Sequence, residues 1–261
     1  MNHSNNKYYS QYGEDKIIEK YFQKKNIING TFFEMGAGDG IQYSNTKFFS
    51  DNGWSGLLVE CDDVQYQKLK KNYEKNQDII VANEKCSKEN DLNFIFKKYN
   101  LKNLDLLSLD IDGLDLTILK LLDFKNFKPK IIIIEYNIYI PNDVEYEDEK
   151  NTGNLSSAFA IKKFLNNCNY KLVNCTFANL IFMEEKFDKE IIPIGLEKIN
   201  ENLNPLRLGI NNNGKILLFS NNTELNKEFF KLPTQKKFII SQPIPRFLRK
   251  KNYHHSQRFL K

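Results

Sequence analysis

Short, uninterrupted apolar runs recur along the chain between residues 30 and 135, and segments with helical spacing separate them. Because each run is apolar throughout rather than alternating, both faces of each strand must be covered, which is typical of a parallel sheet between two layers of helices. Repeated strand and helix units of this kind predict a doubly wound α/β fold. The predicted strands span residues 31–35, 56–60, 78–82, 105–109 and 130–135.

Two helices and a hairpin complete the predicted domain. Apolar positions at helical spacing predict a leading helix over residues 15–23 and an amphipathic helix that follows residue 155. The apolar runs at 170–175 and 179–183 have a short link between them, so they are predicted to pair as antiparallel strands. The result is a Rossmann-like, mostly parallel sheet of seven strands with an antiparallel terminal hairpin, which is the arrangement of class I methyltransferases.

The chain divides, on this pattern, into two parts. Residues 1–185 are expected to form the main domain, and residues 186–261 a C-terminal extension that packs on the same domain. Strand candidates at 206–210 and 215–219 flank a predicted turn at 211–214. From residue 236 onward basic residues gather with almost no acidic ones. This tail either attracts an anionic substrate or membrane surface, or is a solvated tail or terminal helix.

Composition narrows the class of protein. The 261 residues, 41% of them hydrophobic, suffice for one substantial core. The net charge of +5 comes from lysines spread among acidic residues, so no nucleic-acid partner is expected. No run approaches the roughly 20 apolar residues that a membrane span needs, and the N-terminus lacks the apolar segment of a signal peptide. A cytoplasmic protein is therefore expected, while the oligomeric state stays open.

A glycine-rich turn directly follows the first predicted strand, and it is the main functional signal. Gly36, Gly38 and Gly40 let the backbone turn sharply and approach a ligand at the carboxyl edge of the sheet. A dinucleotide-binding turn would have a small residue at position 41, which is Ile41 here. Glu34 precedes the turn, and its carboxylate suits the cationic amino and sulfonium groups of S-adenosylmethionine better than a pyrophosphate.

Glu60 ends the second predicted strand, where a carboxylate can accept hydrogen bonds from both hydroxyls of a ribose. Dehydrogenases use the same arrangement, so Glu60 indicates a nucleotide ribose without choosing the cofactor. An NAD-dependent oxidoreductase therefore remains an alternative function. A methyltransferase-like scaffold without turnover is a second alternative.

Several motifs, taken together, resemble the FkbM-type methyltransferases. They are SQYGED at 10–15, GAGDG at 36–40, SNT at 44–46, GWSGLLVE at 53–60, LDIDG at 109–113 and IEYN at 134–137. The common form of the family has Asp-Val-Glu-Gly where this chain has Asp-Ile-Asp-Gly at 110–113. The resemblance implies methyl transfer from S-adenosylmethionine to an oxygen of a sugar or similar metabolite. The implied acceptor is a bacterial capsule or surface-glycan precursor, methylated at a sugar hydroxyl or a phosphoramidate oxygen.

The expected cofactor-binding residues combine the glycine turn with what this resemblance implies. Glu34 and Gly36 would face the methionine part, and Glu60 the ribose. Ser44 and Asn45 would contact the cofactor or shape its pocket. The full expected set is Gln11, Glu34, Gly36, Ala37, Gly38, Ser44, Asn45, Glu60, Cys61 and Asp110.

Methyl transfer to a neutral hydroxyl also needs a group that takes up the proton. The three histidines, at positions 3, 254 and 255, all lie near the chain ends, so a core histidine base is not expected. Carboxylates or a metal must then do this work, unless a terminal segment folds back over the site.

Asp110, Asp112, Glu135 and Asn137 are the expected catalytic residues, because they follow the fourth and fifth predicted strands at the edge where ligands bind. Oxygen ligands from the first three of them could hold Mg²⁺ or another hard divalent ion that lowers the pKa of the acceptor. The alternative is purely structural, in which Asp112 and Asp115 cap the next helix and Glu135 pairs with a basic residue.

Overall fold

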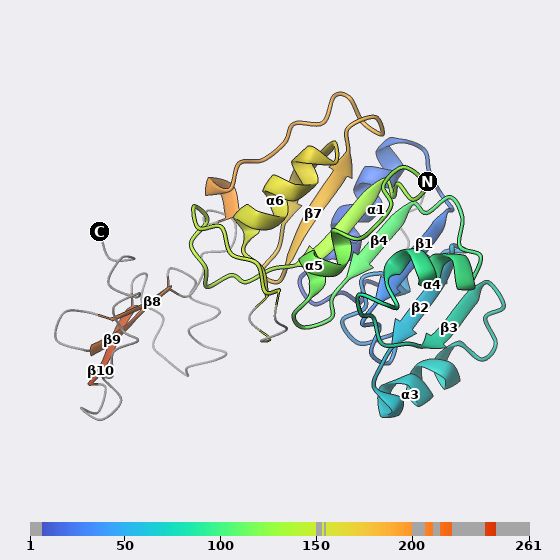
Figure 1. The fold of residues 1–261 in the computed structure, drawn as a ribbon, viewed down its shortest axis with the longest axis horizontal. Coiled ribbons are helices and arrows are strands. Elements are labelled where there is room, and N and C mark those ends of the chain that lie inside the picture. The colour runs from blue at the N-terminus through green and yellow to red at the C-terminus, as the bar shows by residue number, and fades with distance from the viewer. Residues whose placement is uncertain are drawn as a thin grey trace.

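The computed structural model describes residues 7–149, 153 and 155–199, together with three strands at 207–210, 215–220 and 238–243. Its main feature is a seven-stranded sheet with the order β3-β2-β1-β4-β5-β7-β6 (Figure 1). The first five strands run parallel, whereas β7 is antiparallel to both β5 and β6. The strands are β1 Thr31–Met35, β2 Ser55–Glu60, β3 Ile79–Asn83, β4 Leu106–Leu109, β5 Ile131–Glu135, β6 Tyr170–Cys175 and β7 Asn179–Glu184. The predicted fold class and its terminal antiparallel hairpin are confirmed.

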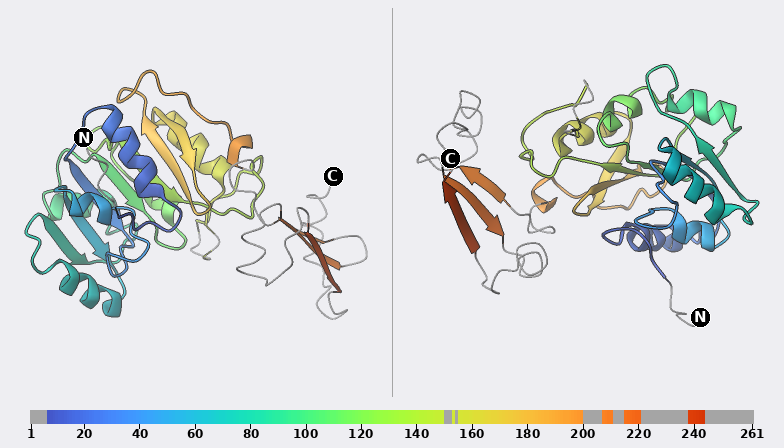
Figure 2. Two further views of the ribbon diagram at one scale, coloured as in Figure 1. Left: turned by 180° about the vertical axis from the view of Figure 1, so that it is seen from behind. Right: turned by 90° about the horizontal axis from the view of Figure 1, so that it is seen from below.

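Helices cover both faces of this sheet, as the apolar strands require (Figure 2). Phe33 of β1 packs in one core with side chains of α4, α5 and α6. Its neighbour Phe32 points the other way and packs with α1, α2 and α3. The two layers are α1 Glu14–Lys24, α2 Lys47–Asp51 and α3 Asp63–Tyr73 on one face, and α4 Leu92–Lys98, α5 Asp115–Leu119 and α6 Ala158–Asn167 on the other.

Alternation along the strands decides which polar side chains share a face at the carboxyl edge. Leu106 of β4 and Ile133 of β5 both belong to the core under α1, α2 and α3. Continuing the period of two along each chain brings Asp110 and Glu135 to that same face. The sheet thus presents two carboxylates from neighbouring strands toward the layer that begins with α1.

The seven-stranded unit continues beyond residue 185, the predicted end of the main domain. The Ile194 N–H donates to the carbonyl of Leu172 in β6, and Ile199 is 3% exposed within the main core. How the remainder of the extension packs stays a prediction. No helix in the part of the chain that the structure describes is long and apolar enough to cross a membrane.

The C-terminal extension contains a three-stranded antiparallel sheet of its own, with the order β10-β9-β8. Strands β8 Arg207–Ile210 and β9 Lys215–Ser220 confirm the two strand candidates there. Strand β10 Phe238–Pro243 lies at the start of the predicted tail and pairs with β9, so this part of the tail is a strand and not a terminal helix. The predicted turn at 211–214 and most of the basic tail lie outside the described residues.

Candidate functional site

The glycine turn lies at the carboxyl edge of the sheet and is fixed by the strands on both sides of it. The Gly36 and Ala37 N–H groups both donate to the carbonyl of Val59 on β2, at 3.0 Å each. On the other side, a Cβ added to Gly36 would lie 1.7 Å from the Asp110 carbonyl oxygen that follows β4. Gly36 has a φ of 79° and an exposed backbone, so a ligand can approach that backbone closely. A residue with a side chain could not take this place.

Glu60 ties this turn to the end of β2. Its carboxylate is nearly buried and accepts the Gly38 N–H at 2.7 Å and the Asp62 N–H at 2.7 Å. A carboxylate oxygen with one such bond can accept another, so a ribose hydroxyl could still bind here. Cys61, the next residue, is exposed beside it.

Glu34 is engaged more fully than its predicted contact with the methionine part suggests. The carboxylate is 4% exposed and accepts hydrogen bonds from the Ser44 hydroxyl at 2.7 Å, the Asn45 N–H at 2.8 Å and the Thr46 hydroxyl at 2.7 Å. Asn45 in turn donates to Ser108 of β4 at 3.1 Å. In this structure Glu34 therefore holds the loop over residues 44–46 against the sheet, which positions the pocket wall.

Burial raises the pKa of Glu34 to about 7, although the three donors of the loop oppose that rise. Because the pKa of Glu34 is higher in the folded than in the unfolded state, the folded state binds more protons. The contribution of protonated Glu34 to the free energy of unfolding is therefore lost as the pH rises from about 4.5 to about 7. We expect the stability advantage of the wild type over Glu34→Gln to shrink across this range. Urea unfolding of both proteins at pH 5 and pH 8 measures it, and a constant difference would contradict the assignment.

The SQYGED segment folds around two buried carboxylates at the start of α1. Asp15 accepts the Tyr9 N–H at 2.6 Å and the Ser10 hydroxyl at 2.6 Å, which fixes the segment that precedes the helix. Gln11 is exposed and donates to the Tyr12 hydroxyl at 3.2 Å, so it remains available for its predicted role over the cofactor.

Glu14 is the functional candidate that sequence reasoning missed. It is fully buried and accepts the Tyr12 N–H at 2.9 Å, the Thr176 hydroxyl at 2.5 Å and the Asn179 side-chain amide at 3.1 Å. The only sequence signal was a second acidic residue within the SQYGED motif. Through Glu14 the leading helix is joined to the β6–β7 hairpin beside the carboxyl edge.

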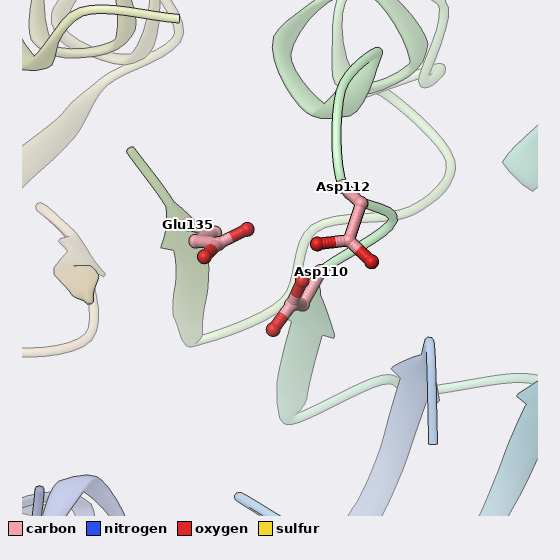
Figure 3. Close-up of side chains that lie close together, drawn as sticks. All are labelled: Asp110, Asp112 and Glu135. Carbon is pink, nitrogen blue, oxygen red and sulfur yellow. The ribbon is translucent and has the colours of Figure 1, made fainter. Parts of the chain in front are cut away.

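Three of the four predicted catalytic residues come together in one cluster. Asp110, Asp112 and Glu135 each offer an oxygen, and these oxygens all lie within 4.8 Å of one another. Figure 3 shows Asp110 and Glu135 at the ends of adjacent strands, with Asp112 on the loop that follows β4. Asp112 has a φ of 57°, in the left-handed region. The structure therefore brings these three carboxylates together, and their catalytic role stays a prediction.

We call Asp110, Asp112 and Glu135 the carboxylate cluster. Burial and mutual repulsion raise the pKa values of two of its members. Burial raises the pKa of Glu135 to about 9, and the charge of Asp110 adds to the effect. Burial also raises the pKa of Asp110, with Asp112 contributing repulsion. Among the described residues, no lysine or arginine forms an ion pair with any of the three. The structural alternative, in which Glu135 pairs with a basic residue, is therefore not found in the described part of the chain.

Asp115 is not a member of the carboxylate cluster but binds the backbone of the loop that follows β4. Its carboxylate accepts the Ile111 N–H at 2.8 Å and the Gly113 N–H at 3.0 Å, so it fixes the loop that carries Asp112. The N-cap position of α5 is occupied by Leu114, without a side-chain cap, so Asp112 does not cap this helix as the structural alternative proposed.

Asn137 begins the long segment that follows β5. Its side-chain oxygen accepts the Tyr139 N–H at 2.9 Å, and its own N–H donates to the Ser156 carbonyl at 2.9 Å. Asn137 therefore shapes the segment beside the cluster, and its catalytic role stays a prediction. Tyr136, the residue before it, is 1% exposed and packs in the core.

The sequence was compared with protein-family models and with curated proteins. Residues 90–172 match the family model described as Methyltransferase FkbM domain. No curated protein matches the sequence.

Three solved structures illustrate the similarity in fold. A SAM dependent methyltransferase from Aquifex aeolicus is 13% identical over 66% of this chain and 87% of its own, with a TM-score of 0.40. The N-terminal domain of EvdMO1 with SAH bound is 11% identical over 67% and 82%, with a TM-score of 0.44. A TehB-like SAM-dependent methyltransferase from Corynebacterium glutamicum is 9% identical over 67% and 89%, with a TM-score of 0.38.

The strand order of the sheet is the one predicted for class I methyltransferases, and the segment at residues 90–172 matches a methyltransferase family model. The resemblance to the FkbM-type methyltransferases is confirmed by the match over residues 90–172, which contain the LDIDG and IEYN motifs.

Proposed function

We propose that this chain is an S-adenosylmethionine-dependent methyltransferase that acts on oxygen, and that its acceptor is a capsule or surface-glycan precursor in the bacterial cytoplasm. The observation that carries the proposal is the carboxylate cluster at the edge of the sheet where the glycine turn also lies. A neutral hydroxyl must lose its proton on methylation, and a cluster of carboxylates is suited to take it up. Neither a nucleic-acid partner nor a membrane span is part of this proposal.

S-adenosylmethionine would supply the methyl group, carried on a cationic sulfonium. The residues present fit this cofactor, because the exposed backbone at Gly36 lies beside the carboxylate that ends β2. Gly36, Ala37 and Gly38 would bind the cofactor by close backbone approach, and Glu60 would accept its ribose hydroxyls. Ser44 and Asn45, with Glu34 behind them, would form the wall, while Gln11 and Cys61 lie exposed at its margin.

The chain's own groups then perform three tasks in the transfer. Bound S-adenosylmethionine would supply the methyl group to the acceptor oxygen and leave as S-adenosylhomocysteine, and a carboxylate of the cluster would take up the hydroxyl proton. Asp110 is the first candidate for that proton, since it lies next to the glycine turn. Asn137 and Asp112 would orient the acceptor from the two following loops. Most of the rate enhancement would come from holding acceptor oxygen and methyl carbon in line.

A divalent cation fits the carboxylate cluster. Three carboxylates in close reach, without a described ion-pair partner, are the oxygen ligands that Mg²⁺ takes. One oxygen of Glu135 is also buried and has no hydrogen-bond partner, so it would accept a cation without losing an existing bond. When bound, such an ion would lower the pKa of an acceptor hydroxyl.

The charge of the site favours a sugar hydroxyl over a phosphoramidate oxygen as the acceptor. Five carboxylates lie on or next to the cluster, and none has an ion-pair partner among the described residues. An anionic acceptor would be repelled by them even if one divalent ion were bound. They are Glu14, Asp110, Asp112, Asp115 and Glu135.

The two competing functions differ in what the sheet and the site support. An all-parallel sheet is typical of dinucleotide-binding folds, and the antiparallel β7 between β5 and β6 disfavours an NAD-dependent oxidoreductase. Calorimetric titration with S-adenosylhomocysteine, and with NAD in parallel, tests this directly. Binding of NAD alone would overturn the proposal.

The decisive experiment is transfer of a labelled methyl group from S-adenosylmethionine to a panel of acceptors. We expect label in neutral sugar nucleotides or glycan precursors, at a position that resists mild base and so identifies an ether. Label on phosphoramidate alone would contradict the preferred acceptor. Cofactor binding without transfer to any extract or acceptor would support an inactive scaffold.

Cation dependence gives a separate prediction. We expect Mn²⁺, used as a probe for Mg²⁺, to bind one site in a calorimetric titration and to raise the melting temperature. Asp110→Asn and Glu135→Gln should each weaken this binding by at least about 10-fold. Glu185→Gln, a change at an exposed carboxylate at the opposite edge, should bind Mn²⁺ as the wild type does. Unchanged turnover after exhaustive chelation would dismiss the cation.

A further inference from the structure

Two buried oxygens next to each other on the sheet lack any hydrogen-bond partner. Within the described residues, the buried side-chain polar atoms without a partner are Oε2 of Glu135 and Oδ1 of Asn179. These residues are register partners on the antiparallel strands β5 and β7. Register partners lie on the same face of a sheet with their Cβ atoms roughly 5 Å apart. Two buried oxygens without a partner therefore belong to side chains at neighbouring positions on one face of the sheet.

The orientation of the Asn179 amide is determined by Glu14. The amide nitrogen donates to the Glu14 carboxylate at 3.1 Å, and the side chain is 5% exposed. Turning the amide over would bring its oxygen against that carboxylate, which is repulsive. Asn179 therefore keeps its carbonyl oxygen turned away from Glu14, although no protein group satisfies it there.

An unsatisfied buried acceptor costs about 1–3 kcal/mol, so a pair of them at one place indicates a missing ligand. When Glu135 is ionised both atoms are acceptors, so a ligand that satisfies them is a donor or a cation. The carboxylate cluster that includes Glu135 supplies three carboxyl groups on one side of the pair, and a bound cation would favour their ionised form. Glu14 adds a fourth behind Asn179, and its contacts given above are all with neutral donors. This surplus of negative charge favours a cation.

We propose that Asn179 supplies a fourth oxygen ligand to a divalent cation held by Asp110, Asp112 and Glu135, and that Glu14 positions it. The inference rests on the cation of the proposed function. Carbonyl oxygens of asparagine are ordinary ligands of hard cations, and a ligand that is itself hydrogen-bonded from behind is held in a fixed orientation. The leading helix thereby becomes part of the cation site through Glu14.

The test is calorimetric titration of Mn²⁺ into the full-length protein and three variants. Asn179→Leu keeps the approximate volume but removes the oxygen, and we expect it to weaken Mn²⁺ binding by about 10-fold or more. Asn179→Asp keeps an oxygen at the same place. We expect this variant to bind Mn²⁺ about 10-fold or more tightly than Asn179→Leu does. Asn166→Leu, at an exposed position near the end of α6, is the matched control and should not change the affinity.

Failure of the inference and failure of the cation itself give different results. If the wild type binds Mn²⁺ and Asn179→Leu binds it equally well, Asn179 is not a ligand and the inference is overturned. If the wild type binds no Mn²⁺, the cation site of the proposed function is contradicted, and so is this inference. S-adenosylhomocysteine affinity, measured on every variant, shows that the fold is intact. If Asn179→Leu does not fold, Glu14→Gln, which loosens the amide, must weaken Mn²⁺ binding for the proposal to stand.

Discussion

Replacing Asp110 by asparagine is expected to lower kcat by about 100-fold or more, because loss of a proton-accepting carboxylate typically costs a factor of 10² to 10⁴. Asparagine has the same shape, and the backbone that supports Gly36 is unchanged, so the fold should persist. Glu135→Gln is expected to give a loss of similar size. Initial rates at saturating S-adenosylmethionine, once an acceptor is known, measure both effects.

The cofactor affinities of the Asp110 variant separate its two predicted roles. S-adenosylmethionine carries a cationic sulfonium and S-adenosylhomocysteine does not. If the Asp110 carboxylate also contacts the cofactor, Asp110→Asn should weaken binding of the cationic S-adenosylmethionine more than binding of S-adenosylhomocysteine. Equal affinities for both, combined with a large loss of kcat, would assign Asp110 to catalysis alone. Full activity in both Asp110→Asn and Glu135→Gln would remove the carboxylate cluster from the mechanism.

Replacing Gly36 by alanine should have the largest effect on the fold and on cofactor binding together. The new Cβ would lie 1.7 Å from the Asp110 carbonyl oxygen, and backbone cannot move aside as a flexible side chain can. The left-handed φ of 79° adds strain of its own. We expect a loss of about 3 kcal/mol or more in the free energy of unfolding, with S-adenosylhomocysteine binding weakened below detection.

Gly53→Ala is a matched control for the backbone strain. Gly53 has a similar φ of 83°, but an added Cβ there would meet nothing within 4 Å. This change should cost about 1 kcal/mol and leave cofactor binding intact. Urea unfolding of both variants, with calorimetry for binding, makes the comparison. Equal destabilisation by the two changes would mean that the contact with Asp110 is not what requires glycine at position 36.

Much of the fold follows from local sequence. The strands of the main sheet are continuous apolar runs, and burial on both faces leaves them few alternatives, so their positions were predicted to within one residue at almost every end. Strand β10 was missed because its short apolar run adjoins a basic tail, and only pairing with β9 makes it a strand. The clustering of Asp110 with Glu135 was predictable because adjacent parallel strands end at the same edge.

Other parts of the site depend on contacts that no local pattern reveals. Glu34 was expected to face the cofactor, but its three partners come from a loop that meets it only after folding. Glu14 and Asn179 are 165 positions apart, and neither gave a signal for the other. The roles of the carboxylates in cofactor binding and catalysis remain predictions, because proximity alone does not determine which one contacts a ligand.

The bond between Glu14 and Asn179 also has a consequence for the order in which the molecule is completed. During synthesis, the first strands, the glycine turn and the carboxylate cluster can form before residue 179 has left the ribosome. The bonds from the hairpin to Glu14, by contrast, must wait for residues 176 and 179, since closing so long a loop is among the slowest contacts in a domain of this size. Nascent chains should therefore carry a largely formed sheet whose N-terminal segment is still open.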